Sequence, residues 1–137
     1  MSSPHEVINP EALAPPVGFS HAVVAATGRT VYLGGQTAHD ESGVITCTGI
    51  VEQFAQAARN VVTALAAAGA RPEHLVSLHI YVTDVENYRS ALPALAAAYR
   101  DSFGKHYPAI ALFEVGALFD PAAEVELVAI AVVPDRP

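Results

Sequence analysis

Three glutamates, Glu114, Glu124 and Glu126, interrupt two otherwise apolar stretches near the C-terminal end of the chain. No Lys or Arg occurs between His106 and Asp135, so a cationic partner for these carboxylates must come from another part of the structure. A partly buried carboxylate can have its pKa raised toward neutrality and then act as a general acid or base. Glu114 and Glu126 are therefore candidate catalytic residues. The alternative is a structural role, in which each accepts hydrogen bonds from backbone N–H groups or ties subunits together.

Six histidines suggest a metal site as a second kind of chemistry. No two of them lie four residues apart, and no cysteine accompanies them in the spacing of zinc ligands. We therefore expect neither a metal site nor a cofactor. The single cysteine, Cys47, has no adjacent base in the sequence, which makes it a weak candidate nucleophile. The six histidines are His5, His21, His39, His74, His79 and His106.

The composition excludes several classes of protein. A length of 137 residues predicts one domain over residues 1–137 that buries roughly two thirds of its unfolded surface. Hydrophobic residues make up 52% and charged residues 15%, which indicates a globular chain with too few charges to cover a monomer, and so favours an oligomer. The net charge of −7, with no basic cluster, argues against a nucleic-acid partner.

The expected location of the protein is the cytoplasm. One cysteine allows no internal disulfide and fits a reducing compartment. The first residues lack the charged and apolar regions of a signal peptide, and no apolar run reaches the ~20 residues of a membrane helix.

The strands that must position these residues follow from apolar, β-branched runs between turn signals. In the C-terminal pair, the strand period of 2 places Ile110, Leu112 and Glu114 on one face of the first strand. It places Glu124, Glu126, Val128 and Ile130 on one face of the second. A turn over Thr27–Arg29 predicts a hairpin between two earlier strands. The expected strands cover Glu6–Ile8, Phe19–Ala26, Thr30–Thr37, Leu75–Val82, Tyr107–Val115 and Ala123–Val133.

Two helices are expected. The first covers Val51–Ala68 and ends at Gly69, with Val51, Phe54, Ala55, Ala58, Val61, Val62 and Leu65 as its apolar stripe and Gln53 outside it. Thr83–Glu86 matches a capping box, which predicts a turn of helix there. Ser90 is the expected N-cap of the second helix, because Pro93 then lies in the first turn. That helix runs to Phe103 before Gly104, with Leu92, Leu95, Ala96, Tyr99 and Phe103 buried.

This order of elements predicts an α+β domain with two helices packed on one face of a sheet, so the other face needs a different cover.

Short motifs run through nearly the whole chain in a characteristic order. They are Ile8-Asn9-Pro10, Val31-Tyr32-Leu33-Gly34-Gly35-Gln36, Ile80-Tyr81-Val82-Thr83-Asp84, Tyr107-Pro108-Ala109 and Phe113-Glu114-Val115. In this order and spacing they resemble the RidA/YjgF family, also labelled L-PSP, of reactive enamine/imine deaminases. The resemblance implies a chorismate-mutase-like fold with a mixed sheet. It also implies a homotrimer in which three chains close a barrel, with pockets for a small metabolite between subunits.

The residues that match the family's pocket differ in chemistry from the family pattern. The family's Pro-Ala-Arg is Pro108-Ala109-Ile110 here, and Leu112 shares the face of Ile110. Its second pocket carboxylate falls on Val128, its pocket tyrosine on Phe19, and its Ser-Gly-Gln on Gly34-Gly35-Gln36. The asparagine of its second helix has Ala96 as the nearest counterpart. The alternative for Ile110 and Val128 is a place in the core, and for Gly34 and Gly35 a strand bend instead of close approach by a ligand.

Two classes of function follow. Arg binds a carboxylate through two charge-assisted hydrogen bonds, whereas Ile110 offers no donor, which argues against the family's 2-imino-acid chemistry unless Arg29, Arg89 or a neighbouring chain supplies a cation. The first class is a hydrolase or deaminase that acts on a C=N bond of a different small metabolite. The second is a non-catalytic, ligand-binding or regulatory trimer. An endoribonuclease, the third interpretation, is disfavoured by the negative charge.

Overall fold

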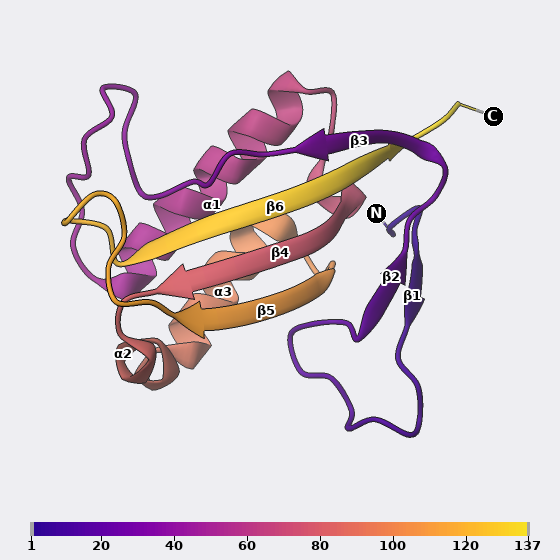
Figure 1. The fold of residues 1–137 in the computed structure, drawn as a ribbon, viewed down its shortest axis with the longest axis horizontal. Coiled ribbons are helices and arrows are strands. Elements are labelled where there is room, and N and C mark those ends of the chain that lie inside the picture. The colour runs from indigo at the N-terminus through magenta and orange to yellow at the C-terminus, as the bar shows by residue number, and fades with distance from the viewer. Residues whose placement is uncertain (1, 137) are drawn as a thin grey trace.

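In the computed structural model, which describes residues 2–136, a four-stranded sheet carries two helices on one face (Figure 1). The strands lie in the order β3-β6-β4-β5, and β4 and β5 are parallel while the other pairs are antiparallel. The predicted α+β class and mixed sheet are confirmed. The four strands are β3 (Gly28–Tyr32), β6 (Val125–Pro134), β4 (Leu75–Val82) and β5 (Ala109–Glu114).

The first helix, α1 (Ile50–Ala67), lies within one residue of its predicted bounds, and Gly69 follows it with a φ of 77°. Such a positive φ suits glycine just beyond a helix end. The prediction that Gln53 lies outside the buried stripe is wrong, since its side chain is 1% exposed. Gln53 Nε2 donates to the carbonyls of Cys47 and Ala122, and its Oε1 accepts from Glu124 N–H. These bonds satisfy the buried amide, which explains how a polar residue can occupy the core.

The second helical region consists of α2 (Val85–Ser90) and α3 (Leu92–Phe103). Both predicted caps are wrong. Asp84, and not Thr83, caps α2 by accepting from Asn87 N–H, while α3 starts after Ala91 without a side-chain cap. Ser90 instead donates to the carbonyl of Glu86 as the last residue of α2. Leu95, Ala98, Tyr99 and Phe103 are the buried residues of α3, so the expected burial of Leu92 and Ala96 is also wrong.

The N-terminal strands form a separate two-stranded sheet. β1 (Glu6–Ile8) pairs with β2 (Ala22–Val24), whereas β3 pairs with β6, so the predicted hairpin over Thr27–Arg29 is wrong. Gly28 is the first residue of β3 and lies opposite Pro134. A Cβ added to Gly28 would lie 2.0 Å from Val133 O, so the glycine permits close approach of two backbones.

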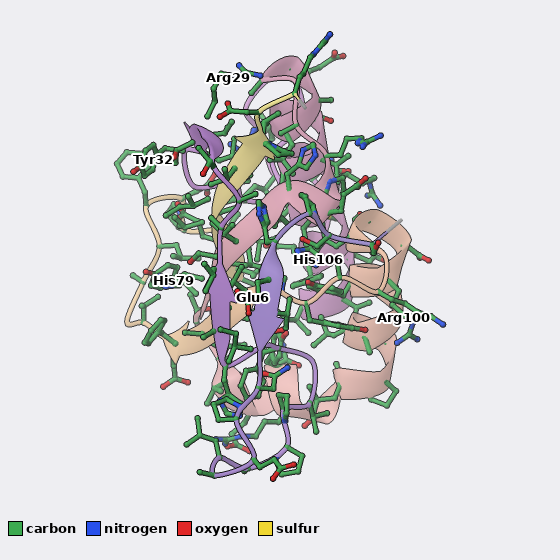
Figure 2. The ribbon with its side chains drawn as sticks, turned by 90° about the vertical axis from the view of Figure 1, so that its right-hand side faces the viewer. Glu6, Arg29, Tyr32, His79, Arg100 and His106 are labelled. Carbon is green, nitrogen blue, oxygen red and sulfur yellow. The ribbon has the colours of Figure 1, made fainter. Side chains whose placement is uncertain are left out.

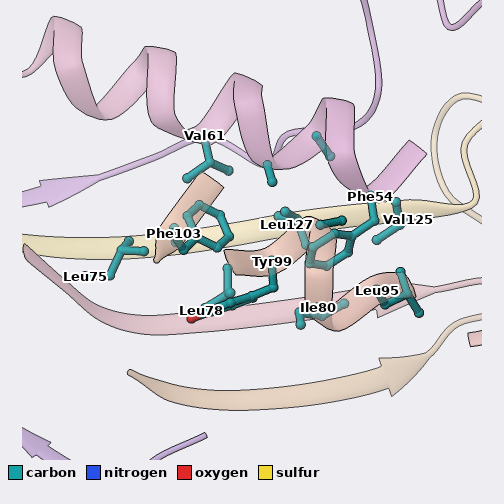
Figure 3. Packing of buried hydrophobic residues seen from close by; sticks show 14 of the residues in the cluster. Phe54, Val61, Leu75, Leu78, Ile80, Leu95, Tyr99, Phe103, Val125 and Leu127 are labelled. Atoms are coloured by element: carbon teal, nitrogen blue, oxygen red, sulfur yellow. The ribbon is translucent and has the colours of Figure 1, made fainter. Parts of the chain in front are cut away.

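The core lies between the sheet and the two helices (Figure 3). Along β6, Val125, Leu127, Ala129 and Ala131 are buried while the intervening side chains are partly exposed, as the period of 2 predicts. Their partners in the core are side chains of α1, β4 and α3. The partners from α1, β4 and α3 that are labelled in Figure 3 are Phe54, Val61, Leu75, Leu78, Ile80, Leu95, Tyr99 and Phe103. In residues 2–136, no helix has the length and apolar character needed to cross a membrane.

His5 joins the N-terminal sheet to the segment before β4, and His106 joins the segment before β5 to β4. The 3-10 turn η1 (Pro72–His74) precedes β4, and the His74 carbonyl accepts from His5 Nε2, while His5 Nδ1 accepts from Ala26 N–H. His106 bonds through Nε2 to the carbonyl of Leu75.

Burial has the largest effect on the pKa of His74 and on that of His106, and it lowers both below 6.5. The nearby His5 lowers both pKa values further, whereas Glu73 raises them. The folded protein therefore favours neutral imidazoles at these positions.

Leu65 is fully buried between α1 and the sheet, so we expect Leu65→Ala to lower the free energy of unfolding by ~2–5 kcal/mol. Urea unfolding measures the change. The control is Thr63→Ala, an exposed position on the same helix, for which we expect a change within about 0.5 kcal/mol. Equal stability of the two variants would contradict the assignment of the buried face.

The lowered pKa values of His74 and His106 predict a loss of stability in mild acid. The unfolded chain binds protons at these residues near pH 6.5, before the folded chain does, so their contribution is complete above pH 6.5 and is lost as the pH falls through the folded pKa values. Urea unfolding at pH 7.5 and 5.0 measures this loss. We expect a smaller pH dependence in the double variant His74→Asn, His106→Gln than in wild type. An unchanged slope in the double variant would refute the prediction.

Candidate functional site

An apolar cavity of about 540 Å³ lies where β5, α3 and the segment before β2 meet. Phe19, Ile110 and Leu112, three of the residues matched to the family's pocket, contribute to its wall. Ile110 and Leu112 point toward α3 because they lie beside Leu78 and Ile80 of β4, which belong to the core. The volume falls within the ~300–1,000 Å³ of small-molecule sites. Both Ile110 and Leu112 also pack against the core, so they contact core and cavity together.

The second wall of this cavity is a stripe along α3. Leu92, Ala96 and Arg100 are spaced by four residues, so they share one helix face, and all three are exposed. Leu92 is 51% exposed, an unusual value for a leucine that was expected in the core. Leu92 and Ala96, the two α3 residues whose predicted burial is wrong, thus both border the cavity.

Three tyrosines, Tyr88, Tyr99 and Tyr107, also line the cavity. Tyr99 and Tyr107 stack with ring centroids 5.1 Å apart, and Tyr99 Oη donates to the carbonyl of His106. Burial raises the pKa of Tyr99 well above its usual value, and burial likewise raises that of Tyr88. The hydroxyl groups of Tyr99 and Tyr88 therefore stay protonated at neutral pH. They can donate hydrogen bonds but cannot act as bases there.

A second group of the predicted residues lies on the other face of the sheet. Glu126 alternates with the buried residues of β6 and therefore points away from the helices. It borders another cavity, of about 550 Å³, together with Gly35, His39 and Asp120. Gly34 and Val128 line neither this cavity nor the one at Ile110.

The carboxylate of Glu126 lies against Gly35. A Cβ at Gly35 would come within 1.8 Å of Glu126 Oε2, so a larger residue at this position would displace the end of the glutamate side chain. At Gly35 the group that lies close to the backbone is the Glu126 side chain of the same protein and not a ligand. A Cβ built at Gly34 would meet only open space. Within residues 2–136, Glu126 has neither an ion pair nor a hydrogen bond from another group. Its carboxylate oxygens are therefore available to a ligand.

The other carboxylates have structural partners. Glu114 Oε1 accepts from Val85 N–H at 3.0 Å, at the start of α2. Glu124 Oε2 accepts from Gly49 N–H at 2.7 Å, just before α1. Each carboxylate therefore satisfies a backbone donor at the beginning of a helix, where such donors lack partners within the helix. This arrangement matches the structural alternative for Glu114.

The outward face of the sheet also carries an aromatic cluster of His79, Tyr81 and Phe113. Tyr81 and Phe113 stack at 5.5 Å, and His79 meets both rings edge-on. Val128 lies beside His79 on the neighbouring strand. Figure 2 shows His79 and Tyr32 on the side of the molecule opposite Arg100, so this face is separate from the cavity at Ile110.

The structure thus brings Phe19, Ile110 and Leu112 together and leaves Gly35 and Glu126 as a separate pair. Arg100 was missed as a site residue, although its spacing of four from Ala96, the position matched to the family's helix asparagine, was a usable signal. Arg29 and Arg89, named as possible replacements for the family arginine, do not line the cavity, and Arg89 pairs with Glu86. Among the described residues, no three His, Cys, Asp or Glu side chains form a group able to hold a metal ion.

Comparison with known proteins places these features in a family. Residues 9–133 match the family described as Endoribonuclease L-PSP. The chain is 33% identical to a 2-iminobutanoate/2-iminopropanoate deaminase of Capra hircus, covering 90% of this chain and 83% of that protein. A protein of unknown function of the conserved Rid family from Yersinia pestis, YyfB, superimposes with a TM-score of 0.85 at 33% identity, over 94% of this chain and 98% of that one. RidA from an Antarctic Psychrobacter species superimposes with a TM-score of 0.67 at 27% identity, over 88% and 92% of the two chains.

The family match covers most of the chain, and the fold agrees over nearly its whole length. The chain therefore belongs to the RidA/YjgF family, also described as endoribonuclease L-PSP.

Proposed function

We propose that this protein is a homotrimer that hydrolyses the C=N bond of a small imine in a pocket between subunits. The observation that carries the proposal is the division of the predicted site between two faces of one sheet. Phe19, Ile110 and Leu112 lie on the helix side, and Gly35 and Glu126 on the outer side. Packing the outer face of one chain near the cavity of its neighbour would unite the two groups.

The exposed outer face supports association. Tyr32 is 77% exposed and Phe113 44%, and β3 and β5 are the edge strands of the four-stranded sheet. A sheet face with exposed aromatic side chains is favourable for contact with other chains. Three copies that associate through these faces would form the barrel implied by the family resemblance.

Glu126 is the proposed general base. Its carboxylate lies beside Gly35 and has no internal partner in the described chain, so it can accept a proton from water. The water oxygen bonds to the imine carbon as the nitrogen takes up a proton. The C–N bond of the resulting carbinolamine then breaks, the carbonyl forms and ammonia leaves. The similarity to deaminases at about one-third identity supports this reaction type.

The apolar side chain of Ile110 would make the substrate choice differ from that of 2-iminobutanoate deaminases. A carboxylate placed against Ile110 would lose its hydration without gaining a donor, at a cost of several kcal/mol. A non-catalytic, ligand-binding trimer is the second candidate function, favoured by this loss of the family's donor. It would keep the cavity and bind a ligand without turnover.

The proposed association predicts a trimer by light scattering at micromolar concentration. Phe113→Arg should shift the protein toward monomer, because it places a charge in the outer face that the proposed trimer buries. Lys105→Ala, an exposed position beyond α3, is the control and should leave the trimer intact. A stable wild-type monomer would exclude a pocket between subunits.

The proposed chemistry predicts slow hydrolysis of 2-iminobutanoate by wild type and a higher kcat/KM for Ile110→Arg, since the new guanidinium supplies a donor on β5, where Ile110 has none. Imines generated from amino acids by an amino-acid oxidase provide the substrates, and ammonia release measures turnover.

Glu126→Gln should reduce hydrolysis of every imine that wild type accepts by about 10²-fold or more. Glu114→Gln is the matched control, and we expect it to retain turnover because that carboxylate serves α2. Turnover unaffected by Glu126→Gln would refute the assigned base, and no turnover on any imine would favour the ligand-binding alternative.

A further inference from the structure

The cavity at Ile110 has apolar walls but carries one guanidinium at its border. Phe19, Ile110, Leu112 and Leu92 supply apolar surface, and Arg100 is the only Lys or Arg among its lining residues. Arg100 lies at the end of the α3 stripe formed with Leu92 and Ala96 and is exposed. A ligand that fills this cavity would therefore meet hydrocarbon along most of its length and a cation at one end.

The guanidinium of Arg100 is free to bind a ligand. Arg71 pairs with Glu73 and Arg89 with Glu86, but in residues 2–136 no carboxylate lies within 4.0 Å of the Arg100 side chain. Arg59, on the exposed side of α1, donates to the amide oxygen of Gln56. Arg100 makes no such side-chain bond in the described chain, so its five N–H donors face solvent and the cavity border.

We propose that Arg100 is the anion-binding residue of this pocket and that its ligand is a monocarboxylate with a bulky apolar body. The location of the pocket rests on the proposed function; the identity of the anion-binding residue and the ligand's shape are additional to it. The guanidinium forms two parallel hydrogen bonds to the carboxylate from α3 instead of from β5. The ligand body then lies against Ile110, Leu112 and Phe19.

Charge and size decide the class of ligand. One guanidinium matches one negative charge, whereas a dianion such as a phosphate monoester would leave a charge unpaired beside apolar walls, in a chain whose net charge is −7. A cavity of about 540 Å³ exceeds the needs of a two- or three-carbon side chain. Branched aliphatic and aromatic bodies gain more from the apolar surface, because burial is favourable in proportion to area.

Titration calorimetry with four stable probes tests this inference on the intact wild-type protein. The probes are 3-phenylpropanoate, propanoate, 3-phenylpropan-1-ol and phenyl phosphate. We expect 3-phenylpropanoate to bind at least about tenfold more tightly than each of the other three, since only it combines one negative charge with a bulky apolar body. Tighter binding of phenyl phosphate or of propanoate would overturn the proposed ligand class.

The variant Arg100→Gln should weaken 3-phenylpropanoate binding about tenfold or more and leave that of 3-phenylpropan-1-ol unchanged. Arg100→Lys, which retains the charge but not the planar fork, should give an intermediate affinity. Arg59→Gln, the matched change on α1, should bind all probes as wild type does. Equal affinity of wild type and Arg100→Gln for 3-phenylpropanoate, or no binding to wild type, would overturn the inference.

These results separate the inference from the proposed catalysis, because none of the probes contains a C=N bond. A protein that binds 3-phenylpropanoate through Arg100 but releases no ammonia from any imine would retain the inference and lose the catalysis. A protein that hydrolyses imines, but whose affinity for 3-phenylpropanoate is unaffected by Arg100→Gln, would retain the catalysis and lose the inference.

Discussion

The alternation of side chains along the four-stranded sheet is the constraint on which the remaining structure depends. Each strand sends successive residues to opposite faces, so β6 buries Leu127 beneath the helices and presents Glu126 on the other side. The same rule turns Ile110 of β5 toward α3. A site that uses both Ile110 and Glu126 therefore cannot form on one face of one chain. Association between chains is the simplest way to bring the two sets together, and this is why the proposed function includes a trimer.

Glycine controls where the backbone and side chains approach most closely. Gly28 lets β3 lie against Val133, and Gly35 makes room for the carboxylate of Glu126. In both positions a Cβ would overlap an oxygen atom, and neither glycine has a positive φ. At Gly28 that oxygen belongs to the backbone, so the requirement for glycine is one of space, whereas at Gly35 it is the end of the Glu126 side chain, which can move. Because Glu126 has no cation or donor of its own among the described residues, its oxygens stay open to another molecule, a property that the proposed general base needs.

The distribution of charge distinguishes this chain from the pattern of the family deaminases. Ile110 removes the donor that the resemblance would place on β5, and Arg100 introduces one at the border of the same cavity from α3. In the proposed binding mode the cation comes from the helix instead of the strand, so the anion is held from a different direction and the ligand meets more apolar wall. Specificity depends on such placement, since a carboxylate without a donor is penalised strongly while apolar surface discriminates more weakly.

The sequence by itself determined the class of fold, the bounds of α1 to within a residue and of β4 in full, and membership of the family, because hydrophobic periodicity and ordered motifs are local signals. It misplaced the strand partners of β2 and β3, the caps of α2 and α3, and the burial of Gln53, Leu92 and Ala96. Those features depend on which distant groups meet: Gln53 is buried because the carbonyl of Ala122 and the N–H of Glu124 lie beside it. Only the tertiary structure showed that Arg100 borders the cavity at Ile110, since this depends on how α3 packs beside β5. Only the tertiary structure showed that Glu126 occupies the space beside Gly35, since these residues lie in segments far apart in the chain.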